Sequence, residues 1–305
     1  MSAAIGLADA LCARLGPDYA ARASATCLSD SPDGRRVTEL RFHPRDAGWR
    51  DVRIIAKEFA TDTGAATYAA MKALEAAEAA RRGAAPLALP RALFYEPRLR
   101  TLALEPAPGR SYRELVREAG FTDHLGLVGG ALAGLHALEV PALRVATLDD
   151  HVRELIRPHP DALATALPEH AGLVADVLAG LREGERAIAY APVPVHRDFH
   201  LGQLFRDRDR VAVIDWDLVA RGDPALDLGN FAVYLRTRVP HAAARGLDAF
   251  LAGYAARAGD GAFARMALYE ALTYVRLACK RLRLRPDGWR EDAVRMLHLA
   301  EARLA

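Results

Sequence analysis

Two short apolar runs, each followed by an aspartate, constrain the fold of this 305-residue chain more than any other feature. The first run, 193–195, lies just before Asp198, and Gln203 follows five residues later. The second run, 211–214, ends directly at Asp215. Short apolar runs bounded by turn-forming residues predict buried strands. We expect the two strands to deliver both carboxylates to one end of a rigid platform.

The side chains of Asp198, Gln203 and Asp215 all offer oxygen atoms, in an order suited to phosphoryl transfer. The carboxylate of Asp198 can accept a proton from an attacking hydroxyl, and the other two can hold Mg²⁺ against the phosphates of a nucleotide. Magnesium prefers oxygen ligands and keeps several of its own waters, so two protein ligands are sufficient. The spacing therefore predicts a magnesium-assisted phosphotransferase site.

Composition excludes several other classes of protein. A hydrophobic content of 51% can fill one large domain or two lobes. A net charge of +2 without a basic run argues against a nucleic-acid partner. The three cysteines are far apart and form no C-x-x-C pair, so neither a zinc site nor a disulfide framework is indicated. The N-terminal segment lacks a basic flank, and no apolar stretch approaches the ~20 residues that span a bilayer, so we expect a cytoplasmic protein without a membrane partner.

The first third of the chain predicts a small mixed lobe. Strand patterns occupy 22–28, 36–43 and 51–59, the last of which carries Lys57, and turn residues separate them. A helix is expected over 65–82, ending at Gly83, and a strand pair follows over 90–95 and 101–105. A further helix is expected over residues 1–20.

The segment Glu105–Gly109, E-P-A-P-G, can continue neither a strand nor a helix and predicts a hinge. We therefore expect a nucleotide-binding lobe over 1–105 and a catalytic, acceptor-binding lobe over 106–305. The second lobe is predicted to be mainly helical, with the catalytic strands interrupting the helices at 193–216. The fold class is α+β. The expected helices cover about 111–119, 124–138, 148–157, 170–187, 224–237, 241–258, 262–285 and 288–304.

The segment HRDFHLGQL, followed by VIDWDLVARGDPALDLGNF, resembles the aminoglycoside phosphotransferase and choline kinase superfamily, whose fold is protein-kinase-like. Members commonly show H-G-D-x-H-x-x-N and then I-D-W/F-[DE], G-D-P and D-L. The resemblance extends from the strand that carries Lys57 to the terminal helices. It implies a small-molecule kinase that uses ATP, with GTP as an alternative, together with Mg²⁺.

The resemblance also implies roles for individual residues. Asp198 corresponds to the catalytic aspartate, and Gln203 and Asp215 to the magnesium ligands. Lys57 corresponds to the strand lysine that grips the nucleotide phosphates. The remaining implied roles are adenine contacts through the backbone of Glu105 and Ala107, a second-metal or acceptor contact at Asp217, and scaffold roles for Asp223 and Asp227.

This chain departs from the family pattern at three places. Glutamine replaces the usual asparagine at Gln203, and no G-x-G-x-x-G loop is present. The helix glutamate that pairs with the strand lysine in the family falls on Thr67, so Glu75 or Glu78 would have to replace it. The partner of Lys57 therefore stays open at this level.

The acceptor is constrained mainly by charge. Residues 231–305 hold 13 basic and 7 acidic residues, whereas 106–195 hold 8 and 12. This balance argues against a highly cationic acceptor. It leaves open sugars, nucleoside antibiotics and other hydroxyl compounds that are neutral or acidic. A role in antibiotic resistance is the expected biological setting, and a monomer or homodimer the expected assembly.

The alternative function is that of a nucleotide-binding pseudokinase that acts as an interaction module. A protein kinase is disfavoured because no activation segment or A-P-E follows Asp215.

Overall fold

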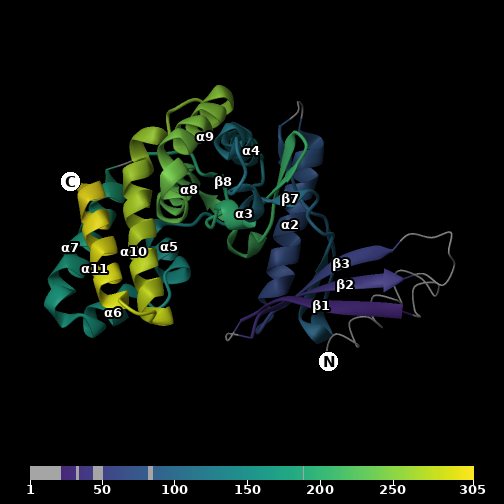
Figure 1. Ribbon diagram of the computed structural model, residues 1–305, viewed down its shortest axis with the longest axis horizontal. Coiled ribbons are helices and arrows are strands. Elements are labelled where there is room, and N and C mark those ends of the chain that lie inside the picture. The colour runs from purple at the N-terminus through teal and green to yellow at the C-terminus, as the bar shows by residue number, and fades with distance from the viewer. Residues whose placement is uncertain (1–21, 32–33, 44–50, 82–84, 188) are drawn as a thin grey trace. The chain divides into compact units, whose positions relative to one another are not determined.

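The computed structural model describes residues 22–31, 34–43, 51–81, 85–187 and 189–305 (Figure 1). The expected helix over 1–20, the turn at 44–48 and the helix end at Gly83 lie outside these residues. The chain forms two compact units. The smaller unit contains the described residues up to Arg81, together with Ala88–Gly109 and Ala212–Asp217. The larger unit contains the remainder, chiefly Arg110–Val211 and Leu218–Ala305.

The smaller unit is built on a five-stranded antiparallel sheet in the order β1-β2-β3-β6-β5. In β2 and β3, alternate side chains such as Leu40, Phe42 and Ile54 face the core, where they join Phe94. This alternation follows from the two-residue repeat of a strand. The strands are β1 (Arg22–Asp30), β2 (Arg36–His43), β3 (Val52–Glu58), β5 (Ala92–Glu96) and β6 (Thr101–Leu104).

Helix α2 (Thr63–Ala80) packs against β5 and β6 of this sheet. It buries Thr67, Met71 and Leu74, which share one helix face because they are three or four residues apart. Between β5 and β6 the chain makes a short 3₁₀ turn, Pro97–Leu99, and Arg100 takes a left-handed conformation at φ 48°. The helix and the strand pair expected from the sequence are therefore present, with shifted ends.

The larger unit is mainly helical. In Figure 1, α10 and α11 run side by side, and α8 and α7 contact them on either side. Helices α4 and α9 form a second close pair. The helices are α3 (Tyr112–Leu115), α4 (Leu125–His136), α5 (Leu148–Leu155), α6 (Pro160–Ala166), α7 (Ala171–Arg186), α8 (Ala225–Arg238), α9 (Ala243–Ala258), α10 (Met266–Leu284) and α11 (Trp289–Leu304). Helix α6 was not expected, although Pro160 occupies the first helical position, where proline is tolerated.

The short strands around the predicted site form two separate sheets. One has the order β4-β10-β9-β7, and the other pairs β8 with β11. The strand before Asp198 is β8, whereas the strand before Asp215 is β10, so the two strands belong to different sheets. The partner of β8 is β11, an unexpected strand that pairs with it in antiparallel fashion. A single platform for both carboxylates stays a prediction. The strands are β4 (Leu87–Ala88), β7 (Arg110–Ser111), β8 (Val193–Val195), β9 (Leu204–Asp207), β10 (Arg210–Val213) and β11 (Ala220–Gly222).

Candidate active site

Lys57 lies at the centre of a charge cluster in the smaller unit. Strand β3 places it in register with Val37 on one side and Leu102 on the other, so that its side chain is mostly buried. Its Nζ atom lies 2.5 Å from Asp215 Oδ1 and 2.7 Å from Asp217 Oδ2. Burial works to lower the pKa of Lys57, but the two carboxylates outweigh it and raise that pKa. Lys57 is therefore held as a cation between two aspartates.

The two aspartates leave this cluster with an excess of negative charge. Burial raises the pKa of Asp217, and the nearby charge of Asp215 raises it further. Lys57 works in the opposite direction but does not outweigh them. The Oδ1 atom of Asp217 is buried without a hydrogen-bond partner among the described residues. Asp215 takes a left-handed backbone conformation, φ 69°, and its side chain is 39% exposed. The indole Nε1 of Trp216 donates to the carbonyl of Val213 at 2.9 Å and stiffens the turn between the aspartates.

Carboxylate oxygens of this kind fit a magnesium ion. They are hard oxygen donors, one of them lacks a partner, and their combined charge exceeds that of Lys57. The described residues contain no cluster of three or more His, Cys, Asp and Glu side chains that could hold a metal. An open site with few protein ligands is what magnesium accepts, because the ion keeps its waters.

The contacts of Glu75 show why it does not pair with Lys57. Its Oε1 atom accepts from the backbone amide of Ala92 at 2.6 Å, and its Oε2 atom pairs with Lys72 at 2.5 Å. The hydroxyl of Thr67 donates to the carbonyl of Thr63 within α2. The strand lysine therefore takes its carboxylates from the Asp215-Trp216-Asp217 segment.

The predicted hinge residues follow β6 in the smaller unit. The amide of Glu105 donates to the carbonyl of Arg91 at 2.9 Å. The Glu105 carboxylate lies 3.4 Å from the same arginine. For the amide of Ala107, the described residues supply no hydrogen-bond acceptor.

In the larger unit, helix α8 holds the loop that carries Asp198. The buried carboxylate of Asp227 accepts from the backbone amides of His196 at 2.7 Å and Arg197 at 2.8 Å. Burial works to raise the pKa of Asp227, but His136 and the loop amide outweigh it and lower that pKa. One turn further, Asn230 Nδ2 donates to the carbonyl of Phe199 at 3.0 Å. Two side chains three residues apart on one helix face therefore fix the loop at two points.

The scaffold role expected of Asp227 is thus visible in its contacts. Asp223 behaves differently: it accepts from the amide of Ala225 and binds Arg265 through both oxygens, at 2.7 and 2.8 Å. It ties the start of α8 to the segment before α10 rather than to the loop. His136 is a buried core histidine, with Tyr254 and Asp227 as its partners.

The carboxylate of Asp198 is mostly buried, with 16% of its side chain exposed. Arg276 Nη2 of α10 lies 3.0 Å from its Oδ1 atom, and His200 Nε2 lies 3.7 Å from the same oxygen. The His200 ring packs on Tyr234 with 4.5 Å between centroids, and its Nδ1 accepts from the amide of Gly202. Burial lowers the pKa of His200 to about 4, so its ring is neutral near pH 7.

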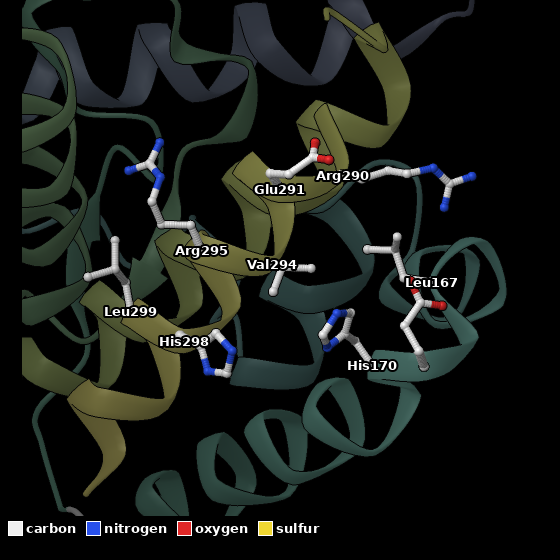
Figure 2. A pocket seen from close by; sticks show the side chains of 9 residues that line it. Leu167, His170, Arg290, Glu291, Val294, Arg295, His298 and Leu299 are labelled. Carbon is white, nitrogen blue, oxygen red and sulfur yellow. The ribbon is translucent and has the colours of Figure 1, made fainter. Parts of the chain in front are cut away.

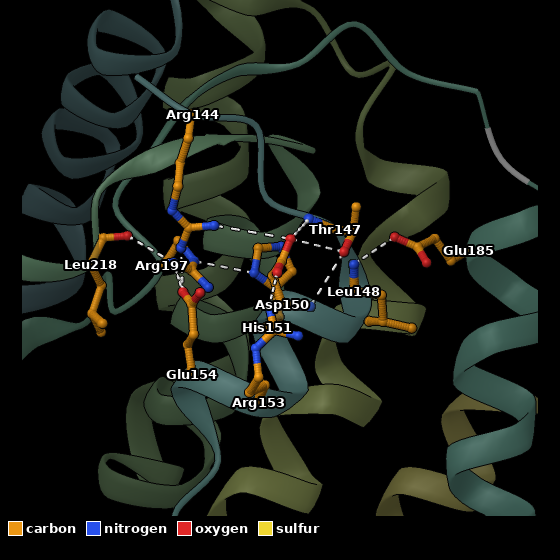
Figure 3. Close-up of polar contacts among 10 residues, drawn as sticks. All are labelled: Arg144, Thr147, Leu148, Asp150, His151, Arg153, Glu154, Glu185, Arg197 and Leu218. Atoms are coloured by element: carbon orange, nitrogen blue, oxygen red, sulfur yellow. Dashed lines mark hydrogen bonds and ion pairs between the residues drawn. The ribbon is translucent and has the colours of Figure 1, made fainter. Parts of the chain in front are cut away.

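Arg197, the residue before Asp198, is buried in a polar network (Figure 3). Its Nη1 lies 2.8 Å from Glu154 and 3.1 Å from the carbonyl of Leu218, and its Nε donates to His151 at 3.1 Å. Its backbone has φ 68°, an uncommon value for a residue other than glycine. Arg197 thus forms a local salt bridge with Glu154 of α5.

Gln203 ends the 3₁₀ turn Leu201–Gln203, and its amide donates to the carbonyl of His200 at 2.9 Å. It belongs to the larger unit, as Asp198 does, whereas Asp215 and Lys57 belong to the smaller unit. Joint coordination of one ion by Gln203 and Asp215 therefore stays a prediction. Sequence reasoning missed four residues that contact the loop or its network: Asn230, Arg276, Glu154 and His151. Of these four residues, only Asn230 could have been predicted from the sequence. It lies three residues after Asp227 in the segment D-L-G-N, so the two side chains share one helix face.

A separate surface hollow lies in the larger unit between α11 and the turn before α7 (Figure 2). Its lining contains none of the predicted site residues. The lining residues are Leu167, Glu169, His170, Arg290, Glu291, Val294, Arg295, His298 and Leu299.

A family model, described as the phosphotransferase enzyme family, matches residues 34–269 and thus most of the chain. The chain belongs to the phosphotransferase enzyme family. This membership confirms the resemblance stated from the motifs and places the chain among small-molecule kinases. No curated protein matches the sequence.

Solved structures of similar fold support the α+β, kinase-like fold that was predicted. A choline/ethanolamine kinase family protein from Mesorhizobium loti is 15% identical, with a TM-score of 0.62 over 92% of this chain and 87% of that chain. Spectinomycin phosphotransferase APH(9)-Ia, solved with ADP and spectinomycin, is 13% identical, with a TM-score of 0.60 over 97% and 98%. A thermostable mutant of aminoglycoside phosphotransferase APH(4)-Ia, solved with ADP and hygromycin B, is 16% identical, with a TM-score of 0.65 over 98% of both chains. Identities this low show the shared fold and leave the acceptor open.

Among the described residues, no helix is long and apolar enough to cross a membrane.

Proposed function

We propose that this phosphotransferase moves the γ-phosphoryl group of ATP to a hydroxyl of a small molecule, an antibiotic or a sugar. The observation that carries the proposal is the cluster in which Lys57 pairs with Asp215 and Asp217. A buried lysine between two carboxylates at a strand end is suited to exchange one anionic partner for the phosphates of a nucleotide. Membership of the phosphotransferase enzyme family supports the same reaction.

Nucleotide binding would use the smaller unit. Lys57 would contact the phosphates, and the backbone of Glu105 and Ala107 would contact the adenine edge. The amide of Ala107 has no acceptor among the described residues, which suits this role. The spectinomycin phosphotransferase and the APH(4)-Ia mutant named above were solved with ADP. ATP is therefore the first nucleotide to test, with GTP as the second.

Gln203 and Asp215 would hold Mg²⁺, and Asp217 would contact a second metal or the acceptor. When bound, the ion neutralises charge that develops on the phosphate oxygens. One buried oxygen of Asp217 has no hydrogen-bond partner in the described part of the chain, which fits a role near a cation.

Asp198 would orient the acceptor hydroxyl and accept its proton. The loop is suited to this task because Asp227 and Asn230 fix its backbone on both sides of Asp198. A rigid base supplies orientation, which accounts for much of the rate in phosphoryl transfer.

The second candidate is a pseudokinase that binds a nucleotide and acts as an interaction module. The buried Thr67, at the position of the family's helix glutamate, favours it. The carboxylates that surround Lys57 argue against it, because they keep the lysine charged without that glutamate.

The deciding experiment is a mass-spectrometric screen for phosphorylated products. Purified protein, Mg²⁺ and ATP would be incubated with aminoglycosides, nucleoside antibiotics, macrolides, sugars and amino alcohols, with Asp198→Asn as the matched control. A product formed only by the unmutated protein supports the kinase. Nucleotide binding without any product or magnesium-dependent ATP hydrolysis would support the pseudokinase.

A further inference from the structure

The surface of the larger unit beside Asp198 is unusually rich in cations. Helix α10 contributes Arg276 and Lys280, which share one face because they are four residues apart, and Arg283 one turn further. Helix α8, which packs against α10 in Figure 1, contributes Arg238. Arg238, Arg276, Arg283 and Asp198 all perturb the pKa of Tyr234, and the same four groups perturb the pKa of Lys280, so the four cations act electrostatically on one small region.

We call Arg238, Arg276, Lys280 and Arg283 the cation cluster. Among the described residues, few acidic side chains pair with its members. Other arginines of the same two helices are neutralised: Arg236 pairs with Glu270 and Arg281 with Asp292. Within the described part of the chain, Lys280, Arg238 and Arg283 form no ion pair. Arg276 contacts the carboxylate of Asp198 at 3.0 Å and the backbone carbonyl of Arg197 at 3.4 Å. Burial lowers the pKa of Lys280, and the nearby Arg238 and Arg276 lower it further.

A favourable interaction with the helix dipoles explains the positions of only some members of the cation cluster. Arg238 and Arg283 lie in the last turns of their helices, where cations interact favourably with the helix dipole. Arg276 and Lys280 lie before the last turn of α10, and both are half-buried. The charge of Lys280 is therefore held near Asp198 and Arg276 at a cost in repulsion and desolvation, without an ion pair to a described acid.

From this geometry we propose that the acceptor carries an anionic group, a carboxylate or a phosphate, which Lys280 and Arg276 bind while its hydroxyl approaches Asp198. The inference rests on the proposed function and narrows its substrate class. Lys280 supplies a mobile point charge, and the guanidinium of Arg276 adds positive charge beside Asp198. A polycationic acceptor would meet repulsion at the same place.

The test uses acceptors that differ only in charge. Glucuronate, glucose and glucosamine form one matched set, and glycerate, glycerol and 3-amino-1,2-propanediol form another. Product formation by the full chain with Mg²⁺ and ATP would be followed by mass spectrometry, and binding of each compound by calorimetry at low and high salt. We expect the anionic member of a set to have at least a tenfold higher kcat/KM than the neutral member, and the cationic member to be the poorest.

Lys280→Gln is the variant that tests the residue assignment. It should lower the ratio of anionic to neutral kcat/KM about tenfold, mainly through KM of the anionic acceptor, and Lys280→Arg should restore part of it. Arg182→Gln is the matched control, because Arg182 is exposed on α7 and pairs with Asp149. It removes one positive charge elsewhere and should leave the ratio unchanged.

The outcomes separate this inference from the proposed function. Products formed preferentially from neutral or cationic members would overturn the inference and leave the kinase intact. Charge-selective binding without any product would support the anion site and count against the kinase. Binding without charge preference would overturn the inference even if no product forms. If Lys280→Gln instead raised KM for ATP equally with every acceptor, the cluster would serve nucleotide phosphates and the inference would be wrong.

Discussion

Lys57 shows how one buried charge organises its surroundings. A buried lysine needs an anionic partner, and here two aspartates of one short segment supply it. The arrangement makes Thr67 tolerable at the position where the family has a glutamate. It also makes Asp215 the residue whose loss is most informative.

Asp215→Asn is expected to weaken magnesium-dependent nucleotide binding at least tenfold. Asparagine tolerates the left-handed backbone at φ 69°, so the variant removes charge without straining the turn. Calorimetric titration with ATP, with and without Mg²⁺, measures the effect. Titration curves identical to those of the unmutated protein would remove Asp215 from the metal site.

Asp198→Asn should reduce turnover by about two to four orders of magnitude, because a general base is removed while the loop geometry is retained. Nucleotide affinity should change less than threefold, since Asp198 lies in the larger unit and nucleotide contacts are proposed for the smaller unit. Turnover and nucleotide Kd measured on the same preparation test both statements. Near-normal turnover would exclude Asp198 as the base.

Glu154→Gln tests the buried partner of Arg197. The carboxylate lies 2.8 Å from Arg197 Nη1, and its removal leaves a buried guanidinium with neutral acceptors only. We expect a loss of about 2–4 kcal/mol in the free energy of unfolding. Urea denaturation measures it, and Glu169→Gln, at an exposed turn residue, is the control. A loss below 0.5 kcal/mol would mean that the pair contributes little to stability.

At the scale of elements, helices α4 and α9 approach so closely that side chains larger than hydrogen do not fit between them. A Cβ atom on Gly129 would lie 1.9 Å from the carbonyl oxygen of Phe250, and one on Gly253 would lie 2.0 Å from that of Gly126. Both obstacles are backbone atoms, which cannot turn away as a side chain would. The glycines therefore fix the distance between these two helices.

Gly129→Ala is expected to destabilise the larger unit by about 1–3 kcal/mol through overpacking. The control is Gly172→Ala in α7, where a Cβ meets nothing within 4 Å. Because alanine has the higher helix propensity, the control should be neutral or stabilise by up to about 1 kcal/mol. Thermal unfolding of both variants measures the difference, and equal melting temperatures would contradict the packing argument.

At the scale of the molecule, buried neutral histidines predict how stability depends on pH. Burial lowers the pKa of His151 to about 3 and that of His200 to about 4, whereas an unfolded chain protonates both near 6.5. Between these values the unfolded state binds more protons, so the free energy of unfolding falls as the pH falls from about 6.5.

Each of the two histidines should contribute up to about 2 kcal/mol of this loss between pH 7 and pH 5. Urea denaturation at the two pH values measures it. His200→Asn, which keeps an acceptor for the amide of Gly202, should show a smaller loss, whereas the exposed His298→Asn should behave as the unmutated protein. A loss that is the same in all three proteins would show that His200 does not control the acid sensitivity.

Local sequence alone determined most of the secondary structure and the family. The strand that carries Lys57 and most of the long helices follow from two- and 3.6-residue periodicities, which neighbouring residues encode by themselves. The motifs around Asp198 and Asp215 identified the phosphotransferase enzyme family, which the family match over residues 34–269 confirms.

Tertiary structure alone decided which charges meet. Lys57 and Asp215 are 158 positions apart in the chain, Arg197 and Glu154 are 43 apart, and no local pattern links the members of either pair. The same holds for Arg276 beside Asp198 and for the separation of the two catalytic strands into different sheets. A buried charge is stabilised by whichever opposite charge the fold brings within a few ångströms, and only the packing of the chain determines which one that is.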